Sequence, residues 1–342
     1  MSTDAPVTQR NGWAWCALAA VLFGAATPAT KLIVDDVGAV TLAGLLYLGA
    51  AGAVAPFALR EARPTATLRQ RSRLLMAVAF GGGLAPVLLV LALDRTPAGT
   101  VSLFLNLELV ATAVIARVFL KEHIGRRAGL GIVIVVIGGI VLAGVSEAGV
   151  ATGAILVAAT CLCWGIDNAI TASLDSYTPS QITVAKGVVA GSVNLALGLL
   201  LHDAPAARFV VAALAIGALG YGLSITMWIT GARLVGAARG QVIFALAPFV
   251  GALLAWPING DRLTVTIMIA FAISLVGVIV VATGHHTHIH THDPREHSHP
   301  IDRDDPHHSP DTIEVLEGSN HRHLVFSHTH EHLPDIHHRH TH

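Results

Sequence analysis

The chain has 342 residues, of which 53% are hydrophobic and only 13% are charged, and its formal net charge is −1. An ordinary soluble domain carries roughly 25% charged residues, so this composition excludes a water-soluble globular protein of the usual kind. Nothing in the charge balance points to nucleic acid, and the three cysteines, Cys16, Cys161 and Cys163, all lie in apolar stretches, where packing is their usual role.

Ten apolar stretches follow one another along the first 283 residues. A hydrocarbon core of about 30 Å needs roughly 20 apolar residues in helical form, so each stretch predicts a membrane span. The stretches are continuously apolar rather than alternating, which favours helices over the strands of a membrane barrel. The predicted spans are Gly12–Val34, Val40–Leu59, Leu74–Leu93, Ala98–Leu120, Ala128–Val145, Ala151–Leu174, Gln181–Leu201, Phe209–Ala232, Gly236–Pro257 and Leu263–Thr283.

Basic residues are concentrated in alternate loops between these spans. The loops between spans two and three and between spans four and five contain Arg60, Arg63, Arg69, Arg71, Arg73, Lys121, Arg126 and Arg127. The alternate loops contain few, mainly Arg95, Arg208 and Arg262. The positive-inside rule therefore places both termini in the cytoplasm, which agrees with an even number of spans. We predict a multi-pass protein of the plasma (inner) membrane.

The chain contains an internal repeat of five spans. Phe104–Val110 in span four can be laid over Phe244–Val250 in span nine, and Phe23 in span one corresponds to Trp164 in span six. An odd number of spans per copy makes the second copy enter the membrane from the opposite face, which produces inverted repeats. We predict an all-α integral membrane fold with a cytoplasmic N-terminus (1–11), two five-helix repeats (12–145 and 151–283) and a cytoplasmic tail (284–342). Duplication for packing alone is the alternative.

The repeated pattern resembles the drug/metabolite transporter superfamily, specifically its paired EamA-type domains. The resemblance covers residues 12–283 and rests on the span count and the order of the motifs Trp164-Gly165, Ala247-Pro248-Phe249, Asp261 and Gly277. The first half departs from the family pattern, because Glu108 stands where proline is usual and Phe23 where tryptophan is usual. The resemblance implies solute transport but no particular solute, since relatives carry amino acids, sugars, nucleotide sugars and other metabolites.

Glu108 is an ionisable residue near the middle of span four, with Asn106 two residues earlier and Thr112 one turn later. A charge at the bilayer centre costs at least about 2.5–3.5 kcal/mol, so such a residue needs an explanation. The carboxyl group could bind a cationic group of the solute or carry a proton. A hydrogen bond between helices, made by the protonated acid, is the structural alternative.

Span six carries a polar stripe. Trp164, Asp167, Asn168 and Thr171 stand at i, i+3, i+4 and i+7, which places them on one face of a helix. We expect this face to line a solute pathway rather than to contact lipid. A capping or interfacial role for Asp167 is the alternative.

Span seven carries Lys186 and Asn194 on roughly one side, and span nine contributes Gln241 as a weaker candidate. Lys186 could neutralise Asp167, or its long side chain could reach the headgroups. If Glu108 and Asp167 both line the pathway, each could exchange protons and couple transport to the proton gradient.

The tail is rich in histidine: 18 of the 20 histidines lie between His285 and His342. Neutral imidazole is a favoured ligand of Zn, Ni, Co and Cu, and alternating histidines on an extended chain project to one side. The candidate metal ligands are His285, His286, His288, His290, His292, His297, His299, His328, His330, His332, His337, His338, His340 and His342. A solubilising or a pH-responsive tail is the alternative.

The tail is otherwise predicted to be disordered, with one exception. Ile313–Leu316 and Leu324–Phe326 are separated by Gly318-Ser319-Asn320, which predicts a small hairpin.

The sequence predicts a secondary transporter that moves a small organic solute by alternating access, with a tail that binds or senses transition metals. It predicts no enzyme, because no paired acid and base, nucleophile motif or phosphate loop is present, and it predicts no required cofactor. A transition-metal (Zn/Ni/Co) transporter whose tail captures the cargo is the alternative, and a non-transporting metal receptor ranks below it. The ten spans contain no histidine, which favours the organic solute. We expect lipid, a small-molecule solute and metal ions as partners, no nucleic acid, and a homodimer as one option for the assembly.

Overall fold

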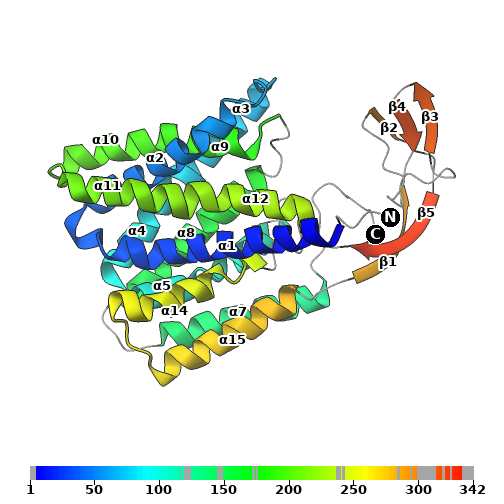
Figure 1. Cartoon of the computed structure of the whole chain (residues 1–342). Coiled ribbons are helices and arrows are strands. Elements are labelled where there is room, and N and C mark those ends of the chain that lie inside the picture. The colour runs from blue at the N-terminus through cyan, green and yellow to red at the C-terminus, as the bar shows by residue number, and fades with distance from the viewer. Residues whose placement is uncertain are drawn as a thin grey trace. The chain divides into compact units, whose positions relative to one another are not determined.

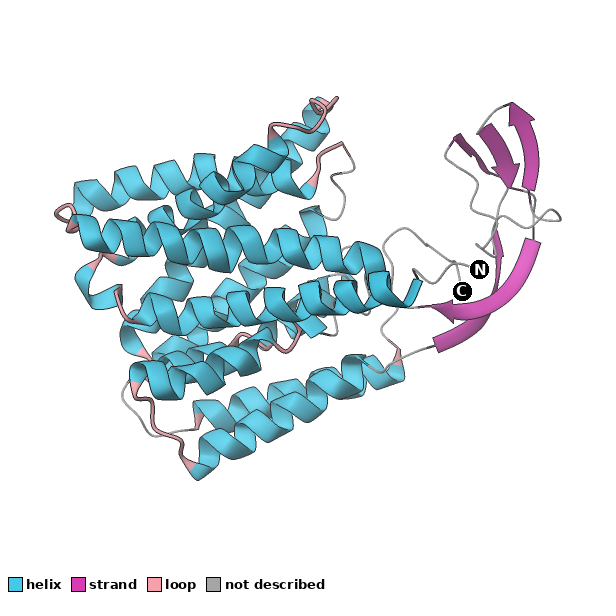
Figure 2. Ribbon diagram, in the orientation of Figure 1, coloured by secondary structure: helices cyan, strands magenta, loops and turns pink. Residues whose placement is uncertain are grey.

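The computed structural model describes residues 5–115, 117–118, 125–144, 149–171, 174, 176–235, 240, 243–282, 286–292, 295–298, 313–317, 320–323 and 326–332. The chain divides into two compact units, Met1–Thr283 and Gly284–His342. The described part of the first unit is helical, whereas the second contains strands (Figure 2).

Nine helices among the described residues are long and apolar enough to cross a membrane. The first half of the helical unit contains α1 (Ala5–Lys31), the short turn η1 (Val34–Asp36), α2 (Ala39–Ala58), a third helix made of α3 (Leu68–Ala77), η2 (Val78–Leu84) and α4 (Ala85–Arg95), a fourth made of α5 (Ala98–Phe104) and α6 (Leu107–Ile115), and α7 (Arg126–Ala143). The second half contains α8 (Val150–Thr171), a helix made of α9 (Pro179–Ala185), η4 (Lys186–Ala190) and α10 (Gly191–Leu201), a helix made of α11 (Ala207–Ile216), η5 (Gly217–Leu223) and α12 (Ser224–Val235), then α14 (Ala247–Asn259) and α15 (Val265–Ala282).

Helix α14 is the exception among the ten predicted spans. It is apolar but has only 13 residues, which at 1.5 Å per residue is about 20 Å, less than the bilayer core requires. The predicted span begins at Gly236, which lies outside the described residues, and the helix ends two residues beyond the predicted Pro257. The other nine predicted spans each correspond to a long apolar helix.

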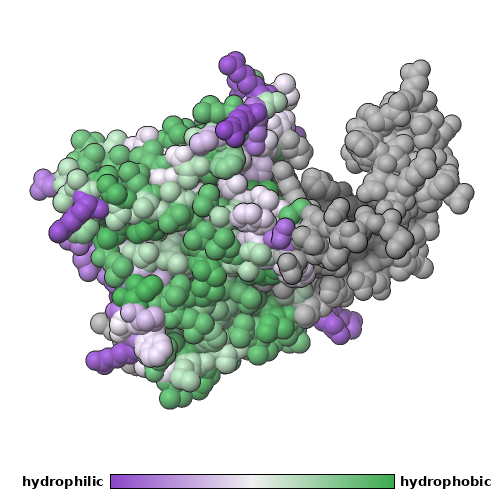
Figure 3. Space-filling view, viewed as in Figure 1, coloured by the Kyte–Doolittle hydropathy of each residue, from purple (hydrophilic) through white to green (hydrophobic). Residues whose placement is uncertain are grey.

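The surface of the helical unit is apolar along the helices and polar at their ends (Figure 3). Large hydrophobic side chains are exposed on its sides, among them Ile155 at 71%, Leu200 at 83% and Val265 at 73%. Exposed apolar area on this scale marks a surface that meets something other than water. The chain is a multi-pass membrane protein.

Several of the long helices contain a π-helical segment, among them η2 in the third helix, η4 in the seventh and η5 in the eighth. Each segment is rich in glycine or small residues, and η2 includes the run Gly81-Gly82-Gly83. The segments η2 and η5 both have seven residues and both interrupt the third helix of their half. A π segment widens the turn and frees backbone carbonyls from the regular ladder, and such segments are frequent at functional sites.

The fourth helix is broken at Leu105-Asn106, between α5 and α6. A turn at Ala245-Leu246 precedes α14 in the same way, and the sequence repeat lays these two turns over each other. Asn106 donates from Nδ2 to the Leu103 carbonyl at 2.9 Å. Its side chain therefore satisfies a carbonyl at the break, and the pathway role of Asn106 stays a prediction.

Close packing between the two halves depends on small residues. Helices α7 and α15 lie side by side (Figure 1), and a Cβ added to Gly131 would lie 2.7 Å from the Gly277 carbonyl oxygen. Likewise a Cβ on Gly44 in α2 would lie 2.8 Å from the Gly191 carbonyl oxygen of α10. Small residues let helices approach where no hydrophobic force drives them together in lipid.

We expect Gly131→Ala to lower the free energy of unfolding by about 1–3 kcal/mol, the usual cost of overpacking. The added methyl would also meet Val281 Cγ2 at 2.5 Å, so α15 must move. Gly52→Ala in α2 is the matched control, since nothing lies within 4 Å of its Cβ position and alanine is the better helix former. The midpoint temperature of thermal unfolding in detergent should fall for Gly131→Ala and not for Gly52→Ala. Equal midpoint temperatures for the two variants would contradict the close packing of α7 against α15.

The second unit contains β1 (His286–His292), β2 (Arg295–Ser298), β3 (Ile313–Glu317), β4 (Asn320–His323) and β5 (Phe326–His332). Strand β1 pairs antiparallel with β5, and β4 pairs antiparallel with both β2 and β3. The expectation of a disordered tail is therefore wrong for these segments, because alternating Thr, Ile and His residues pair as strands. The predicted hairpin is correct only in its first strand, which lies in β3. The partner of β3 is Asn320–His323, whereas Phe326 of the predicted second strand belongs to β5 and pairs with β1.

Candidate functional site

The π segment η2 is the centre of a polar cluster inside the helical unit. The Gly81 carbonyl accepts a hydrogen bond from the Tyr47 hydroxyl at 2.6 Å and another from Trp164 Nε1 at 3.3 Å. The Gly83 carbonyl accepts one from Asn194 Nδ2 at 3.1 Å. Buried carbonyls need partners, so side chains from three other helices, α2, α8 and α10, are fixed around this segment.

Asp167 and Lys186 form an ion pair beside η2. Lys186 Nζ lies 2.6 Å from Asp167 Oδ2, and the two side chains are only 15% and 7% exposed. Thr171 donates to the other oxygen, Asp167 Oδ1, at 3.1 Å. The sequence left two roles open for Lys186, and in the structure Lys186 neutralises Asp167. The ion pair connects α8 with the start of η4.

Gly81 makes room for this pair. A Cβ at that position would lie 2.1 Å from Asp167 Oδ2 and 2.3 Å from its Cγ, closer than any real contact. The carboxylate therefore rests directly against the glycine backbone. Gly81 is therefore a functional candidate that is not among the site residues predicted from the sequence.

Glu108 forms a second polar group with residues of α6 and α8. Asn168 Nδ2 lies 3.1 Å from Glu108 Oε1 and 3.5 Å from Thr112 Oγ1, so the amide donates to Glu108 and is at the limit of a bond to Thr112. Asn168 is exposed and Glu108 is half-buried. Among the described residues no cation pairs with Glu108. Its carboxyl group is therefore the acid in the cluster that can take up a proton or a cationic group.

A row of aromatic rings extends from the cluster. Ring centroids are 5.9 Å apart for Tyr47 and Tyr221, 5.7 Å for Tyr221 and Phe23, and 5.2 Å for Phe23 and Phe244. Trp228 continues the row at 5.9 Å from Phe244. Tyr47 was missed by sequence reasoning, although a hydroxyl in an otherwise apolar span usually seeks a partner.

The predicted site residues are thus largely brought together. Trp164, Asp167, Lys186 and Asn194 surround η2, and Thr171 bonds to Asp167. Glu108, Thr112 and Asn168 form the adjacent group. Asn106 bonds within its own helix, and Gln241 lies outside the described residues.

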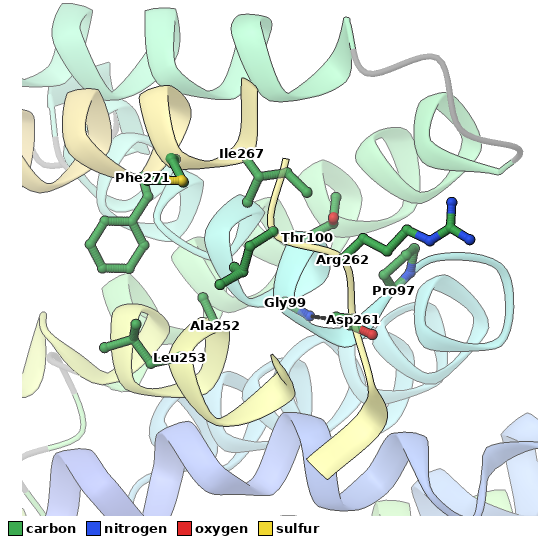
Figure 4. A pocket seen from close by; sticks show the side chains of 11 residues that line it. Pro97, Gly99, Thr100, Ala252, Leu253, Asp261, Arg262, Ile267 and Phe271 are labelled. Atoms are coloured by element: carbon green, nitrogen blue, oxygen red, sulfur yellow. Dashed lines mark hydrogen bonds between the residues drawn. The ribbon is translucent and has the colours of Figure 1, made fainter. Parts of the chain in front are cut away.

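A separate pocket lies between α5, α14 and α15 (Figure 4). Leu253, Ile267 and Phe271 contribute to an apolar lining, and Asp261 Oδ2 accepts a hydrogen bond from the Gly99 N–H at 2.7 Å. Burial raises the pKa of Asp261, while the Gly99 bond and the positive charge of Lys31 act in the opposite direction. Asp261 joins the α14–α15 loop to α5, so this pocket belongs to a connection between the halves rather than to the polar cluster.

Some of the candidate metal ligands of the tail lie on its strands, and the others lie outside the residues that the structure describes. His286, His288, His290 and His292 lie on β1, His297 on β2, and His328, His330 and His332 on β5. His285, His299, His337, His338, His340 and His342 lie outside the described residues. Where side chains are described, no group of three His, Cys, Asp or Glu residues is arranged to hold a metal ion.

Comparisons with known proteins agree with this architecture. The EamA-like transporter family matches the chain twice, over residues 10–144 and 151–283. An uncharacterized transporter of Methanothermobacter thermautotrophicus (strain Delta H) is 24% identical over 217 residues, which cover 61% of this chain and 63% of that protein, so the match spans less than two thirds of that relative. A solved crystal structure shares 15% identity with a TM-score of 0.59, covering 81% of this chain and 98% of the other, and is similar in fold alone.

Proposed function

Because the chain belongs to the EamA-like transporter family, we propose that it is a secondary transporter that moves a small organic solute across the membrane by alternating access. The observation that supports this most is the polar cluster around η2, where a buried ion pair lies inside an apolar helical unit beside Glu108, a carboxyl group that has no cationic partner among the described residues. Ionisable groups in such positions are expensive and typically mark a solute or ion pathway.

We propose that residues 12–145 and 151–283 are inverted repeats, with α14 as part of the ninth span. Support comes from equivalent contacts between the halves. Helix α1 packs against α12 and α14, and its counterpart α8 packs against α4 and α6. Helices α2 and α10, like α7 and α15, pack against each other as equivalent pairs. Repeats related in this way can exchange conformations and open a central site to either side in turn.

Within this cycle we assign different roles to the two acids. Asp167 is already neutralised by Lys186, so it serves to hold α8 and η4 together next to Gly81. Glu108 has an amide donor but no cationic partner among the described residues. It is the group that would bind an amine of the solute or exchange a proton, and the aromatic row beside Tyr47 would contact the solute's apolar part.

Glu108→Gln is expected to abolish the pH dependence of uptake, because the amide keeps the size of the side chain but cannot ionise. Vesicles would be screened with labelled amino acids, sugars and polyamines, and the probe that wild-type vesicles accumulate would then be followed against pH. Asp94→Asn is the control, since Asp94 is 43% exposed and paired with Arg95. A Glu108→Gln variant with wild-type rate and an unchanged pH profile would exclude the proton role.

We further propose that the protein lies in the inner membrane with both termini in the cytoplasm, and that its tail binds Zn, Ni, Co or Cu without being needed for solute transport. The described helices contain no histidine, which supports an organic solute over a metal cargo. A variant that ends at Gly284 should keep organic flux and lose metal binding. Loss of Zn²⁺ flux from this variant, with organic flux absent throughout, would instead favour the metal transporter.

A further inference from the structure

Strands β1 and β5 form a two-stranded ribbon in which histidines are paired across the strands (Figures 1 and 2). The register places His286 opposite His332, His288 opposite His330, and His290 opposite His328. The two strands are separated by 33 residues in the sequence, so the chain's local pattern does not bring these histidines together. The pairing is a property of the fold of the tail.

The three pairs share one face of the ribbon. Successive residues of a strand alternate between faces, so positions 286, 288 and 290 belong to one face and their partners on β5 to the same one. The other face carries Thr287 opposite Glu331, Ile289 opposite Thr329, and Thr291 opposite Ser327. One face thus has three consecutive His–His pairs, followed by His292 opposite Phe326, and the other face has no histidine.

We propose that this histidine face is a divalent transition-metal site, in which two neighbouring cross-strand pairs supply four imidazole ligands to one ion. Directly opposite residues have Cβ atoms about 4.5–5.5 Å apart, and neighbouring pairs follow at about 6.7 Å along the strand. Zinc typically takes four ligands in a tetrahedral arrangement, with metal–nitrogen bonds of about 2.0–2.1 Å, and two neighbouring pairs provide four histidines on one face. The inference rests on the proposed metal binding of the tail and adds where the ion is held.

The central pair, His288 and His330, decides whether any four-histidine set exists. Two sets of adjacent pairs are possible, and both include the central pair. One set adds His286 and His332, and the other adds His290 and His328. Without the central pair the two outer pairs stand four residues apart, about 13 Å along the strand. In the other sheet of the tail His297 stands opposite His321, a single His pair that cannot provide four ligands by itself.

The test keeps the number of histidines constant and changes only their face. In the exchange variant Thr287→His, His288→Thr, Thr329→His and His330→Thr, both members of the central pair move to the opposite face. The full-length protein, purified in detergent, would be titrated with Zn²⁺ by equilibrium dialysis and with Co²⁺, whose visible absorption reports tetrahedral coordination. His297→Gln with His321→Gln is the matched control that removes two histidines outside the ribbon.

We expect the exchange variant to bind Zn²⁺ at least about 100-fold more weakly and to lose the tetrahedral Co²⁺ spectrum, because even outer-shell changes cost about 10–100-fold in metal affinity. The control should retain the tightest site. Equal affinities for wild type and exchange variant would overturn the ribbon site and leave a tail that binds metal by histidine content alone. If the variant that ends at Gly284 binds Zn²⁺ like wild type, the proposed metal binding of the tail fails instead.

Discussion

Lys186→Met is expected to lower the free energy of unfolding by about 3–5 kcal/mol, the usual cost of leaving a buried charge without its partner. Asp167 is 7% exposed and its Oδ2 lies 2.6 Å from Lys186 Nζ, so the variant leaves a largely buried carboxylate without its counter-charge. The measurement is the midpoint temperature of thermal unfolding in detergent, followed by the recovery of monodisperse protein.

The double variant Lys186→Met with Asp167→Asn separates charge from packing. Replacing both members of a buried pair is often close to neutral, so the double variant should regain most of the lost stability. Thr171 can still bond to the new amide at residue 167, since it donates to Oδ1 in the wild type. A single variant that unfolds at the wild-type temperature, or a double variant no better than the single one, would show that the pair is not a buried, coupled unit.

Gly81→Ala should abolish transport, whereas Gly83→Ala should leave it near the wild-type rate. Both glycines lie in η2 and the chemical change is identical. The new methyl at 81 would lie 2.1 Å from Asp167 Oδ2, so the carboxylate or the helix must move. At 83 the nearest atoms are 3.6 Å and 4.0 Å away, which is ordinary contact.

The expected size of the Gly81→Ala effect follows from the cost of overpacking, about 1–3 kcal/mol, and from the loss of the geometry around Asp167. Uptake of the accumulated probe into vesicles, normalised to the amount of inserted protein, is the measurement. Equal uptake by the two glycine variants would mean that contact between Asp167 and η2 has no part in transport.

The sequence predicts the helices well because lipid leaves few alternatives. Long apolar stretches such as Val40–Leu59 and Leu263–Thr283 correspond closely to α2 and α15, since a span must close all its hydrogen bonds within itself. The stripe at Trp164, Asp167 and Thr171 was also predictable, because helical periodicity fixes which residues share a face. The partners of these residues on other helices are harder to predict from the sequence. For Lys186, for example, the sequence left open whether it neutralises Asp167 or reaches the lipid headgroups.

Features that depend on helix irregularity were not predictable. Nothing in Gly81-Gly82-Gly83 distinguishes a π segment from a packing surface, so the bonds from Tyr47 and Asn194 to its carbonyls could not be foreseen. The break in the fourth helix, which gives the Asn106 amide a local acceptor, was likewise not predictable. In the tail, alternation predicts a shared side, but the pairing of β1 with β5 requires a register that no local pattern encodes.

The hydrogen bonds to η2 also limit how the third helix can move. Tyr47, Trp164 and Asn194 hold two of its carbonyls from three directions. Rotation of the helix about its own axis, or sliding along it, would break all three bonds at once, whereas tilting together with α2, α8 and α10 would break none. The third helix therefore has few independent degrees of freedom, and in the alternating-access cycle proposed above we expect these four helices to move together.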